Sequence, residues 1–440
     1  MSTYAKEARA TLALALPIVV GQVSQMLMGI TDSVMIGHVG TLPLAAAAFT
    51  NSVFGVFFVV GIGVLVPVAV LVSRAHGAGR EHEAGEWLRH GVTIALAASG
   101  GGSLLMALLA LQLHRFGQPP EVLAEVQPYY LIIAASLVPT LLFQAFRQFG
   151  EALGRPWPPM LMMLGGVGLN VVLNWILIYG HLGAPAMGLE GAGWATLIAR
   201  TAGVFMILAW LTQAAAFRIA WPRVWFRGLQ RARFREMLHL GVPAAGMLLF
   251  ESGAFSAAAL MMGWLGAVPL AAHQIALSCA ALTFMFPLGL SMAVSMRLGK
   301  AVGEGRREVL RPIGFGALGI SVAIMGGFAL IFAIAGRPLA AAFVADAGVI
   351  DLAARLLVVA AIFQLFDGGQ VVGAGALRGL ADVKIPAIIT FAAYWLIALP
   401  GGYFAGVRGP LGPLGVWAAL AAGLAFAAVF LALRFARLTR

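Results

Sequence analysis

Charged side chains are scarce in this sequence. Only 10% of its 440 residues are Asp, Glu, Lys or Arg, whereas 61% are hydrophobic, and the mean hydropathy is +0.95. A water-soluble chain of this length needs far more charge to cover its surface, so the composition excludes a soluble globular protein. Cysteine is also nearly absent: Cys279 is the only one, which excludes a disulfide within the chain.

The motifs of common enzymes and of ATP-driven pumps are missing as well. The chain has no P-loop, no zinc-ligand spacing and no nucleophile elbow. Its glycine-rich segment GLEGAG, residues 188–193, joins two long apolar runs, which disfavours a dinucleotide site there. We therefore expect no catalytic residues, no cofactor and no enzymatic activity.

Long apolar runs are what the sequence has in abundance, and twelve of them are long enough to cross a bilayer. They cover residues 11–36, 43–72, 91–113, 127–147, 158–180, 191–215, 237–264, 270–296, 313–335, 349–376, 385–406 and 414–434. The first run lacks the cleavage site of a signal peptide, so we interpret it as a transmembrane helix. Internal prolines such as Pro67, Pro139 and Pro287 predict kinks.

Lysine and arginine are distributed unevenly over the two sides of these spans. If both termini lie on the same side, that side holds 23 basic residues and the other side holds four, with Arg200 inside a span. The positive-inside rule then places both termini in the cytoplasm. The net charge of +11 is thus an orientation signal. Nucleic-acid binding is disfavoured, because the basic residues are scattered with almost no exposed aromatic residues between them.

The chain repeats itself with a shift of 226 residues. Residues 17–80 align with residues 243–306 without a gap, and 16 of the 64 positions are identical. The identities include Pro17 with Pro243, and the loop RAHGAGR returns as KAVGEGR. Because each half has six spans, both halves have the same orientation, and a pseudo-twofold axis along the membrane normal should relate them.

These observations predict an all-α polytopic membrane protein with twelve transmembrane helices in two six-helix lobes. Residues 1–215 form the N-terminal lobe, residues 237–440 form the C-terminal lobe, and residues 216–236 form a basic, amphipathic linker at the cytoplasmic surface. Two lobes with a cleft between them are the architecture of alternating access. The alternative is a duplication that serves only as a scaffold.

Three acidic residues lie deep inside spans: Asp32, Glu251 and Asp367. Placing a carboxylate at a helix centre costs about 2.5–3.5 kcal/mol on insertion scales. Protonating a glutamate at pH 7, against its ordinary pKa of ~4.3, costs about 3.7 kcal/mol. Because the cost of burying the charge and the cost of protonating it are comparable, such a group can change between its neutral and its ionised form. This property suits coupling to protons or cations. The alternative is a static ion pair, for which few basic partners, Arg200 and Arg355, lie within the spans.

Asn170 and Asn174 are four residues apart in the fifth span and face the same side of it. With Asp32 and Thr196 they form a set of oxygen ligands in the first lobe. Such a set suits a hard cation such as Na⁺, and protonation of Asp32 would compete with that cation. Asparagine in membrane helices also joins neighbouring helices by hydrogen bonds, and this alternative stays open.

The second lobe differs chemically from the first. Asp367 has a glutamine three residues away on either side, and Glu251 aligns in the repeat with Gln25. Further residues are predicted to line a substrate cleft, with ordinary packing as the alternative for each of them. They are Gln25, Met28, Phe255, His273, Gln274, Phe286, Gln364 and Gln370.

These features together resemble the multidrug and toxic compound extrusion (MATE) family. The resemblance rests on P…GQ…TDSVMIGHVG, RAHGAGR, LAAHQIAL and the six-plus-six repeat, and it covers essentially the whole chain. The glutamate in the seventh span and the aspartate in the tenth resemble the bacterial NorM-type branch. The resemblance implies a monomeric antiporter of the bacterial cytoplasmic membrane that exports cationic drugs and dyes in exchange for H⁺ or Na⁺.

The resemblance also implies roles for particular residues. Glu251 and Asp367 match the second-lobe carboxylates that couple cations and recognise cationic substrates. The first-lobe cation site is matched by Asp32, Asn170, Asn174 and Thr196. Two positions depart from the family pattern: Phe363 replaces a tyrosine of some NorM-type members, and Asn174 replaces an aspartate of another branch. The coupling ion and the lobe that binds it therefore stay open.

Two other functions are alternatives. A lipid-linked precursor flippase of the same wider superfamily should have a strongly basic cleft for pyrophosphate, whereas the embedded charges here are mainly acidic. An ion channel is disfavoured, because the repeat contains no segment that resembles a selectivity filter.

Overall fold

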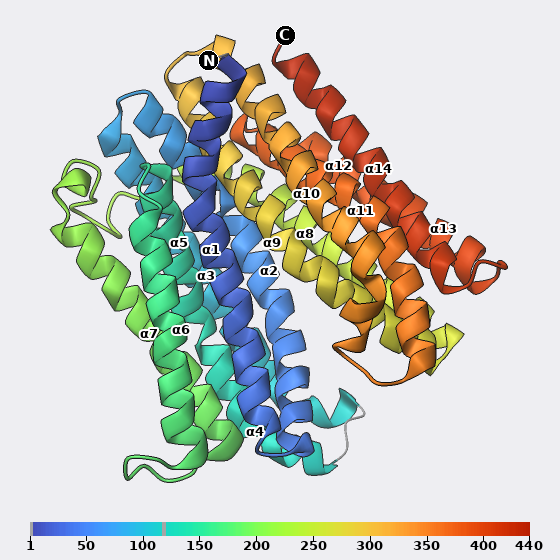
Figure 1. The fold of residues 1–440 in the computed structure, drawn as a ribbon. Helices are drawn as coiled ribbons and strands as arrows, with labels where there is room; N and C mark the ends of the chain where they lie inside the picture. Colours follow the sequence, from blue (N-terminus) through green and yellow to red (C-terminus); the bar gives the residue numbers. More distant parts are fainter. Residues whose placement is uncertain (1–2, 117–119) are drawn as a thin grey trace. The chain divides into compact units, whose positions relative to one another are not determined.

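The computed structural model describes residues 3–116 and 120–440. This part of the chain consists of helices joined by loops, and no strand occurs in it (Figure 1). Twelve of its helical segments are long and apolar enough to cross a membrane. The predicted all-α polytopic class is therefore confirmed.

The twelve spans follow the predicted order along the chain. They are α1 (Thr3–Gly37), α2 (Thr41–Gly77), α3 (Glu81–Ala110), α4 with α5 (Pro120–Ala135 and Leu137–Ala152), α6 (Trp157–Tyr179), α7 (Gly188–Gln213), α8 (Arg231–Leu265), α9 (Ala267–Gly303), α10 (Leu310–Ala341), α11 (Ala347–Gly379), α12 with α13 (Lys384–Phe391 and Leu399–Gly402), and α14 (Pro413–Leu438). In the eleventh span, a π-helical segment follows α12 at Ala392–Ala398, and another follows α13 at Tyr403–Val407. Most helices extend beyond the predicted apolar runs. The polar residues that flank these runs also form the backbone hydrogen bonds of an α-helix.

The three prolines expected to kink their helices have different surroundings. Pro139 follows a break between α4 and α5. It has no N–H group, so the carbonyl of Ala135 loses its helical donor. By contrast, α2 and α9 continue through Pro67 and Pro287 as single helices. Of these prolines, only Pro139 adjoins a break in its helix.

The loop motif shared by the two halves of the repeat ends α2 and α9 in the same way. RAHGAGR places Gly79 at φ +70°, and KAVGEGR places Gly305 at φ +74°. Glycine takes this left-handed conformation without strain, so the chain can turn directly after the helix. The repeat in the sequence is therefore also a repeat in backbone conformation.

The chain divides into two compact units whose limits cut through α1 and α8. The N-terminal unit comprises residues 20–245, and the C-terminal unit comprises residues 1–19 and 246–440. The lobes proposed from the sequence, 1–215 and 237–440, follow the chain instead. Each unit thus contains the first part of a helix whose remainder belongs to the other unit.

Two glycines at equivalent positions of the repeat explain why the first part of α1 and the first part of α8 each pack in a different unit from the rest of the helix. A Cβ atom on Gly63 of α2 would collide with Ala245 of α8, and one on Gly289 of α9 would collide with Val19 of α1. Glycine lets the helix backbones approach this closely, as is common between membrane helices. A shift of 226 residues relates the two contacts, so the same packing holds the start of α8 and the start of α1.

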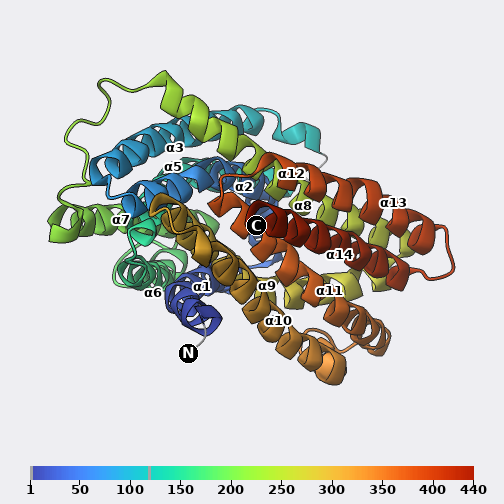
Figure 2. The same ribbon diagram turned by 90° about the horizontal axis from the view of Figure 1, so that it is seen from above.

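A central helix organises each unit. In the C-terminal unit α11 packs against α9, α10 and α14 (Figure 2). In the N-terminal unit α2 packs against α3, α4 and α5. Buried polar side chains on these central helices need hydrogen-bond partners, because an unpaired buried polar group costs free energy.

Candidate functional site

Two of the predicted carboxylates interact in the C-terminal unit. Glu251 comes from α8 and Asp367 from α11, and each lies in the electrostatic field of the other. Asp367 is only 3% exposed, because neighbouring helices enclose α11. Among the described residues, none donates a hydrogen bond to its Oδ1 atom. Two adjacent carboxylates with an unpaired buried acceptor favour a proton or a bound cation between them.

Tyr394, which the sequence reasoning missed, joins this pair. Its hydroxyl forms a hydrogen bond with Glu251 and donates another to Gln370 Oε1 at 3.3 Å. Tyr394 lies in the π-helical segment of the eleventh span, just before Pro400, whose missing N–H disturbs the regular α-helical pattern. The signal available in the sequence was a phenol in the middle of an apolar run.

Arg378 is a positively charged neighbour of Glu251 that the sequence reasoning did not single out. Arg378 follows the predicted span 349–376 and lies in the last turn of α11, where it donates to Ser291 Oγ at 2.7 Å. It also interacts electrostatically with Glu251. No Lys or Arg lies near Glu251 along the sequence, so tertiary packing brings this basic neighbour to it. Two carboxylates and one guanidinium leave the site with an excess of one negative charge when all are ionised.

Aromatic rings pack against Tyr394 and against one another. Phe255 lies 6.1 Å from Phe363 and 6.0 Å from Tyr394, measured between ring centroids, and Phe363 lies 5.5 Å from Trp417. Phe363 is buried and packs in this cluster. Tyr394 supplies a hydroxyl from another helix. Aromatic faces beside carboxylates suit an organic cation.

Other residues predicted to line a cleft in this unit have packing partners. His273 is fully buried and accepts a hydrogen bond from Trp417 Nε1 at 3.1 Å. Gln364 accepts one from Thr283 Oγ1 at 2.9 Å. Phe286 packs against Phe328 of α10, with 5.0 Å between ring centroids, and Gln274 is exposed. His273 and Gln364 thus join helices to one another.

The N-terminal unit brings the four predicted oxygen ligands together. Asp32 Oδ1 accepts a hydrogen bond from Asn174 Nδ2 at 2.5 Å, and the same amide group lies 3.2 Å from Asn170 Oδ1. Asn170 Nδ2 lies 3.4 Å from Thr196 Oγ1. Within the described part of the chain, Asn174 Oδ1 has no hydrogen-bond donor. The set therefore has a free oxygen for a cation. On the same helix as Asp32, Gln25 is exposed and Met28 is half-buried.

Arg200 balances the charge of Asp32 in this unit. The two residues interact electrostatically. Arg200 lies one turn after Thr196 on α7, where its Nη1 donates to Ser136 Oγ at 2.5 Å and its guanidinium lies 4.7 Å from the ring centroid of Phe54. One carboxylate and one guanidinium give a neutral site when both are ionised, unlike the site in the C-terminal unit.

The N-terminal unit also contains a buried ion pair near the end of α5. Arg147 and Glu151 of α5 are 1% and 3% exposed, and Arg147 Nε lies 3.5 Å from Glu151 Oε1. Arg147 Nη1 donates to Gln22 of α1 at 3.0 Å. Tertiary packing rather than position along the apolar run therefore buries Glu151.

Comparison with known proteins identifies the family. The MatE family model matches residues 17–176 and 243–404, one copy in each half of the chain. This chain belongs to the MatE family. The two matches begin at Pro17 and Pro243, the residues that open the gapless repeat. The protein is therefore a transporter, as its sequence motifs indicated.

Curated relatives place the chain in the NorM-type branch of the MatE family. A probable multidrug resistance protein NorM of Mesorhizobium japonicum is 34% identical over 99% of this chain and 95% of its own length. The multidrug resistance protein PmpM of Pseudomonas aeruginosa is 35% identical over 99% of this chain and 92% of its own length. These bacterial relatives and the twelve spans indicate a multi-pass protein of the inner membrane.

Solved MATE structures share the fold. A mutant of the Vibrio cholerae MATE transporter VcmN matches with a TM-score of 0.92 and 21% identity, over 100% of this chain and 98% of that one. The eukaryotic MATE transporter AtDTX14 matches with a TM-score of 0.89 and 21% identity, over 100% and 99% of the two chains. At this identity the similarity concerns the fold alone.

Proposed function

We propose that this protein is a secondary antiporter that exports cationic amphiphilic compounds in exchange for H⁺, Na⁺ or both. The observation that carries the proposal is the cluster of Glu251, Asp367 and Tyr394, which combines an excess of negative charge with aromatic neighbours. The names of the relatives, multidrug resistance proteins NorM and PmpM, support the same class of function.

In this mechanism a coupling ion and an organic cation compete for the same carboxylates. When a proton or Na⁺ neutralises Glu251 or Asp367, the site attracts the organic cation less, and the compound is released. When the ion leaves, the unpaired charge favours binding of the next cation. One elementary charge that crosses 100 mV supplies about 2.3 kcal/mol, enough for a roughly fiftyfold gradient.

The N-terminal unit serves the coupling ion rather than the drug. Hydrogen bonds link Asp32, Asn170, Asn174 and Thr196 to one another, and their oxygen atoms suit H⁺ or Na⁺. Because Arg200 offsets the charge of Asp32, an organic cation gains little electrostatic attraction there. An ion bound in this unit would add to the exchange at Glu251 and Asp367, where the drug and the coupling ion compete.

The topology follows from the distribution of basic residues. Both termini lie in the cytoplasm, together with the basic linker at residues 216–236. A proton or Na⁺ that enters from outside moves down its gradient while the drug moves outward. The transporter works as a monomer, because each chain contains both sets of candidate ligands.

Drug efflux from proteoliposomes tests the proposal. The purified chain is reconstituted, loaded with ethidium, and given an imposed pH gradient or an imposed Na⁺ gradient, one at a time. An antiporter accelerates ethidium movement with at least one of the gradients, and an ionophore that collapses that gradient removes the acceleration. Ethidium movement that is the same with and without either gradient would rule out ion-coupled antiport.

The flippase alternative makes a different demand on the site. A pyrophosphate headgroup needs an excess of basic residues, whereas Glu251 and Asp367 outnumber Arg378 in the C-terminal unit. A flippase would move a lipid-linked pyrophosphate across the vesicle membrane and would leave ethidium in place. The same proteoliposomes therefore separate the two functions.

A further inference from the structure

The segment between α7 and α8, residues 214–230, lies at a membrane surface. α7 ends at Gln213 and α8 begins at Arg231, and both helices are membrane spans. A connection between two spans must leave the hydrocarbon region, because its backbone groups need partners that lipid tails do not provide. What this segment exposes therefore faces lipid headgroups or the adjoining water.

One face of the segment is fixed to the N-terminal unit by aromatic rings. Phe217 is fully buried, 4.8 Å from Trp210 of α7 and 6.0 Å from Phe149 of α5 between ring centroids. Trp221 and Trp225 pack against Phe146 of α5, at 6.4 Å and 6.2 Å. The segment is thus held in place although it contains no long helix.

Polar contacts fix the same segment to α3. Arg89 donates to the backbone carbonyl of Arg227, and the backbone N–H of Gln230 donates to His90 Nε2 at 3.0 Å. Directly after the segment, at the start of α8, the guanidinium of Arg233 lies 4.8 Å from the ring centroid of Trp87. These contacts leave the side chains on the opposite face of the segment free to meet other molecules.

The opposite face combines exposed arginines with exposed apolar side chains. The exposed arginines are Arg218, Arg223 and Arg227, and the exposed apolar residues are Ile219, Val224 and Phe226. Ile219 is 74% exposed and Phe226 is 62% exposed. Within the part of the chain that the structure describes, no carboxylate pairs with any of the three arginines. This combination is typical of a segment that lies in a lipid headgroup layer.

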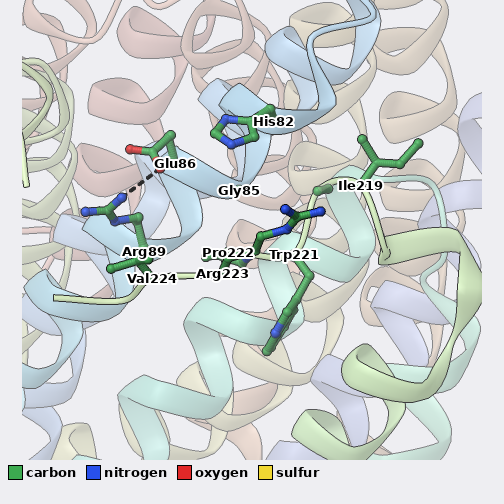
Figure 3. Close-up of a pocket in the computed structure, with 10 residues that line it drawn as sticks. His82, Gly85, Glu86, Arg89, Ile219, Trp221, Pro222, Arg223 and Val224 are labelled. Atoms are coloured by element: carbon green, nitrogen blue, oxygen red, sulfur yellow. Dashed lines mark hydrogen bonds and ion pairs between the residues drawn. The ribbon is translucent and has the colours of Figure 1, made fainter. Parts of the chain in front are cut away.

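A pocket of about 230 Å³ lies between this segment and the start of α3 (Figure 3). It is lined by His82, Gly85, Glu86 and Arg89 of α3 and by residues 219–224. Figure 3 shows the Glu86–Arg89 pair, which is 2.8 Å long, at one side of the pocket and Trp221 directed away from His82. Glu86 pairs with Arg89, and among the described residues no carboxylate forms an ion pair with Arg223, which also lines the pocket.

We propose that residues 218–227 and this pocket bind the headgroup of an anionic phospholipid. The phosphate would lie by Arg223 and His82, with Arg218 and Arg227 beside it, and Ile219 and Phe226 would contact the acyl chains. Clustered arginines next to a membrane span attract anionic lipid, and their exposed apolar neighbours prefer a lipid to a soluble anion. Lipid binding would anchor this segment at the membrane surface, and it does not depend on the proposed antiport function.

Lipid titration followed by native mass spectrometry tests the proposal. The purified full chain is incubated with phosphatidylglycerol, phosphatidylcholine or inorganic phosphate. The triple variant Arg218→Gln, Arg223→Gln, Arg227→Gln is compared with the wild type. A triple change to Lys keeps the charge. A control triple removes the same charge from other exposed positions: Arg307→Gln, Arg437→Gln, Arg440→Gln.

Phosphatidylglycerol binding should fall by more than about tenfold in the first Gln triple, and it should stay near the wild-type level in the Lys triple and in the control triple. Phosphatidylcholine binding should stay the same in all of them. Equal loss in the control triple would show diffuse attraction instead of a site, and displacement of the lipid by millimolar inorganic phosphate would show a site for the free anion. Either result overturns the proposal.

A second measurement uses the unchanged protein, in case the triple variant does not fold. A photoactivatable phosphatidylglycerol is crosslinked to the wild type, and the labelled peptides are identified by mass spectrometry. Labelling should concentrate in residues 214–230 and in the first turns of α3. Labelling spread evenly over the membrane-facing helices would overturn the proposal. Neither measurement depends on drug transport, so failure of the antiport function would not affect them.

Discussion

Tyr394 donates a hydrogen bond to Gln370 across 3.3 Å, and the same hydroxyl also bonds to Glu251. A phenol has a single proton to donate, so Gln370 and an ionised Glu251 compete for it. When Glu251 is neutralised by a proton or a cation, the hydroxyl turns to Gln370. This one side chain therefore responds to the charge of Glu251, and it does so beside Asp367.

Tyr394→Phe removes that hydroxyl and keeps the ring. A neutral hydrogen bond contributes about 0.5–1.5 kcal/mol, so the apparent affinity for the coupling ion should change by roughly two- to tenfold. Ethidium efflux at a series of pH values and Na⁺ concentrations measures the change. Tyr403→Phe is the matched control, because Tyr403 lies in the same span, and its hydroxyl accepts from Arg408 outside the cluster. Identical behaviour of the two variants would contradict the role of Tyr394.

Glu251→Gln and Asp367→Asn remove one charge each and keep the shape of the side chain. Each variant should lose ethidium or fluoroquinolone export, by at least about tenfold, because the cation then loses a charged partner that contributes about 1.5–3 kcal/mol. Export is measured in cells with equal amounts of protein in the membrane. Glu308→Gln, an exposed carboxylate, should transport normally. Normal transport in both site variants would refute the assignment of this pair.

Asp32→Asn separates ion coupling from drug binding. It removes the only carboxylate of the N-terminal set and leaves an amide that can still bond with Asn174. Ion-driven efflux should fall by more than about tenfold, whereas equilibrium binding of the drug should change by less than about threefold. Efflux in proteoliposomes and binding by fluorescence anisotropy give the two values. Equal loss in both assays would indicate that Asp32 binds the drug directly.

Arg200→Gln removes the positive charge that balances Asp32. A cation near Arg200 is repelled, and like charges in a partly desolvated site cost several kcal/mol. The variant should therefore need less Na⁺ for half-maximal transport, by more than about tenfold, if Na⁺ binds in the N-terminal unit. Arg355→Gln, an exposed arginine of α11, is the control. An unchanged Na⁺ requirement would place Na⁺ binding elsewhere or leave H⁺ as the coupling ion.

Gly289→Ala and Gly63→Ala test the close helix contacts that hold the starts of α1 and α8. The added methyl would collide with Val19 or with Ala245, and overpacking costs about 1–3 kcal/mol. Both variants should have a lower Tm in detergent, measured by thermal shift. Gly327→Ala is the matched control, since a Cβ atom there meets nothing within 4 Å. Its Tm should be unchanged or slightly higher, because alanine favours the helix.

Much of the fold could be predicted because it depends on local properties. Apolar runs of sufficient length predicted all twelve spans, and the gapless repeat at Pro17 and Pro243 predicted the two halves that the family model matches. The break at Ser136, between α4 and α5, shows the limit of this approach. A proline in an apolar run is compatible with a continuous helix, a bend or a break, and only packing selects among them.

The sequence by itself determined the transporter class and the buried carboxylates, because a charge in a long apolar run is recognisable without knowing its neighbours. It also brought Asp32, Asn170, Asn174 and Thr196 into one set. Only the tertiary structure decided their partners: Tyr394 and Arg378 for Glu251, and Arg200 for Asp32. These partners lie more than a hundred residues away along the chain, and the depth and rotation of each helix determine which side chains meet. The balance of charge at each site is thus a property of the packed helices.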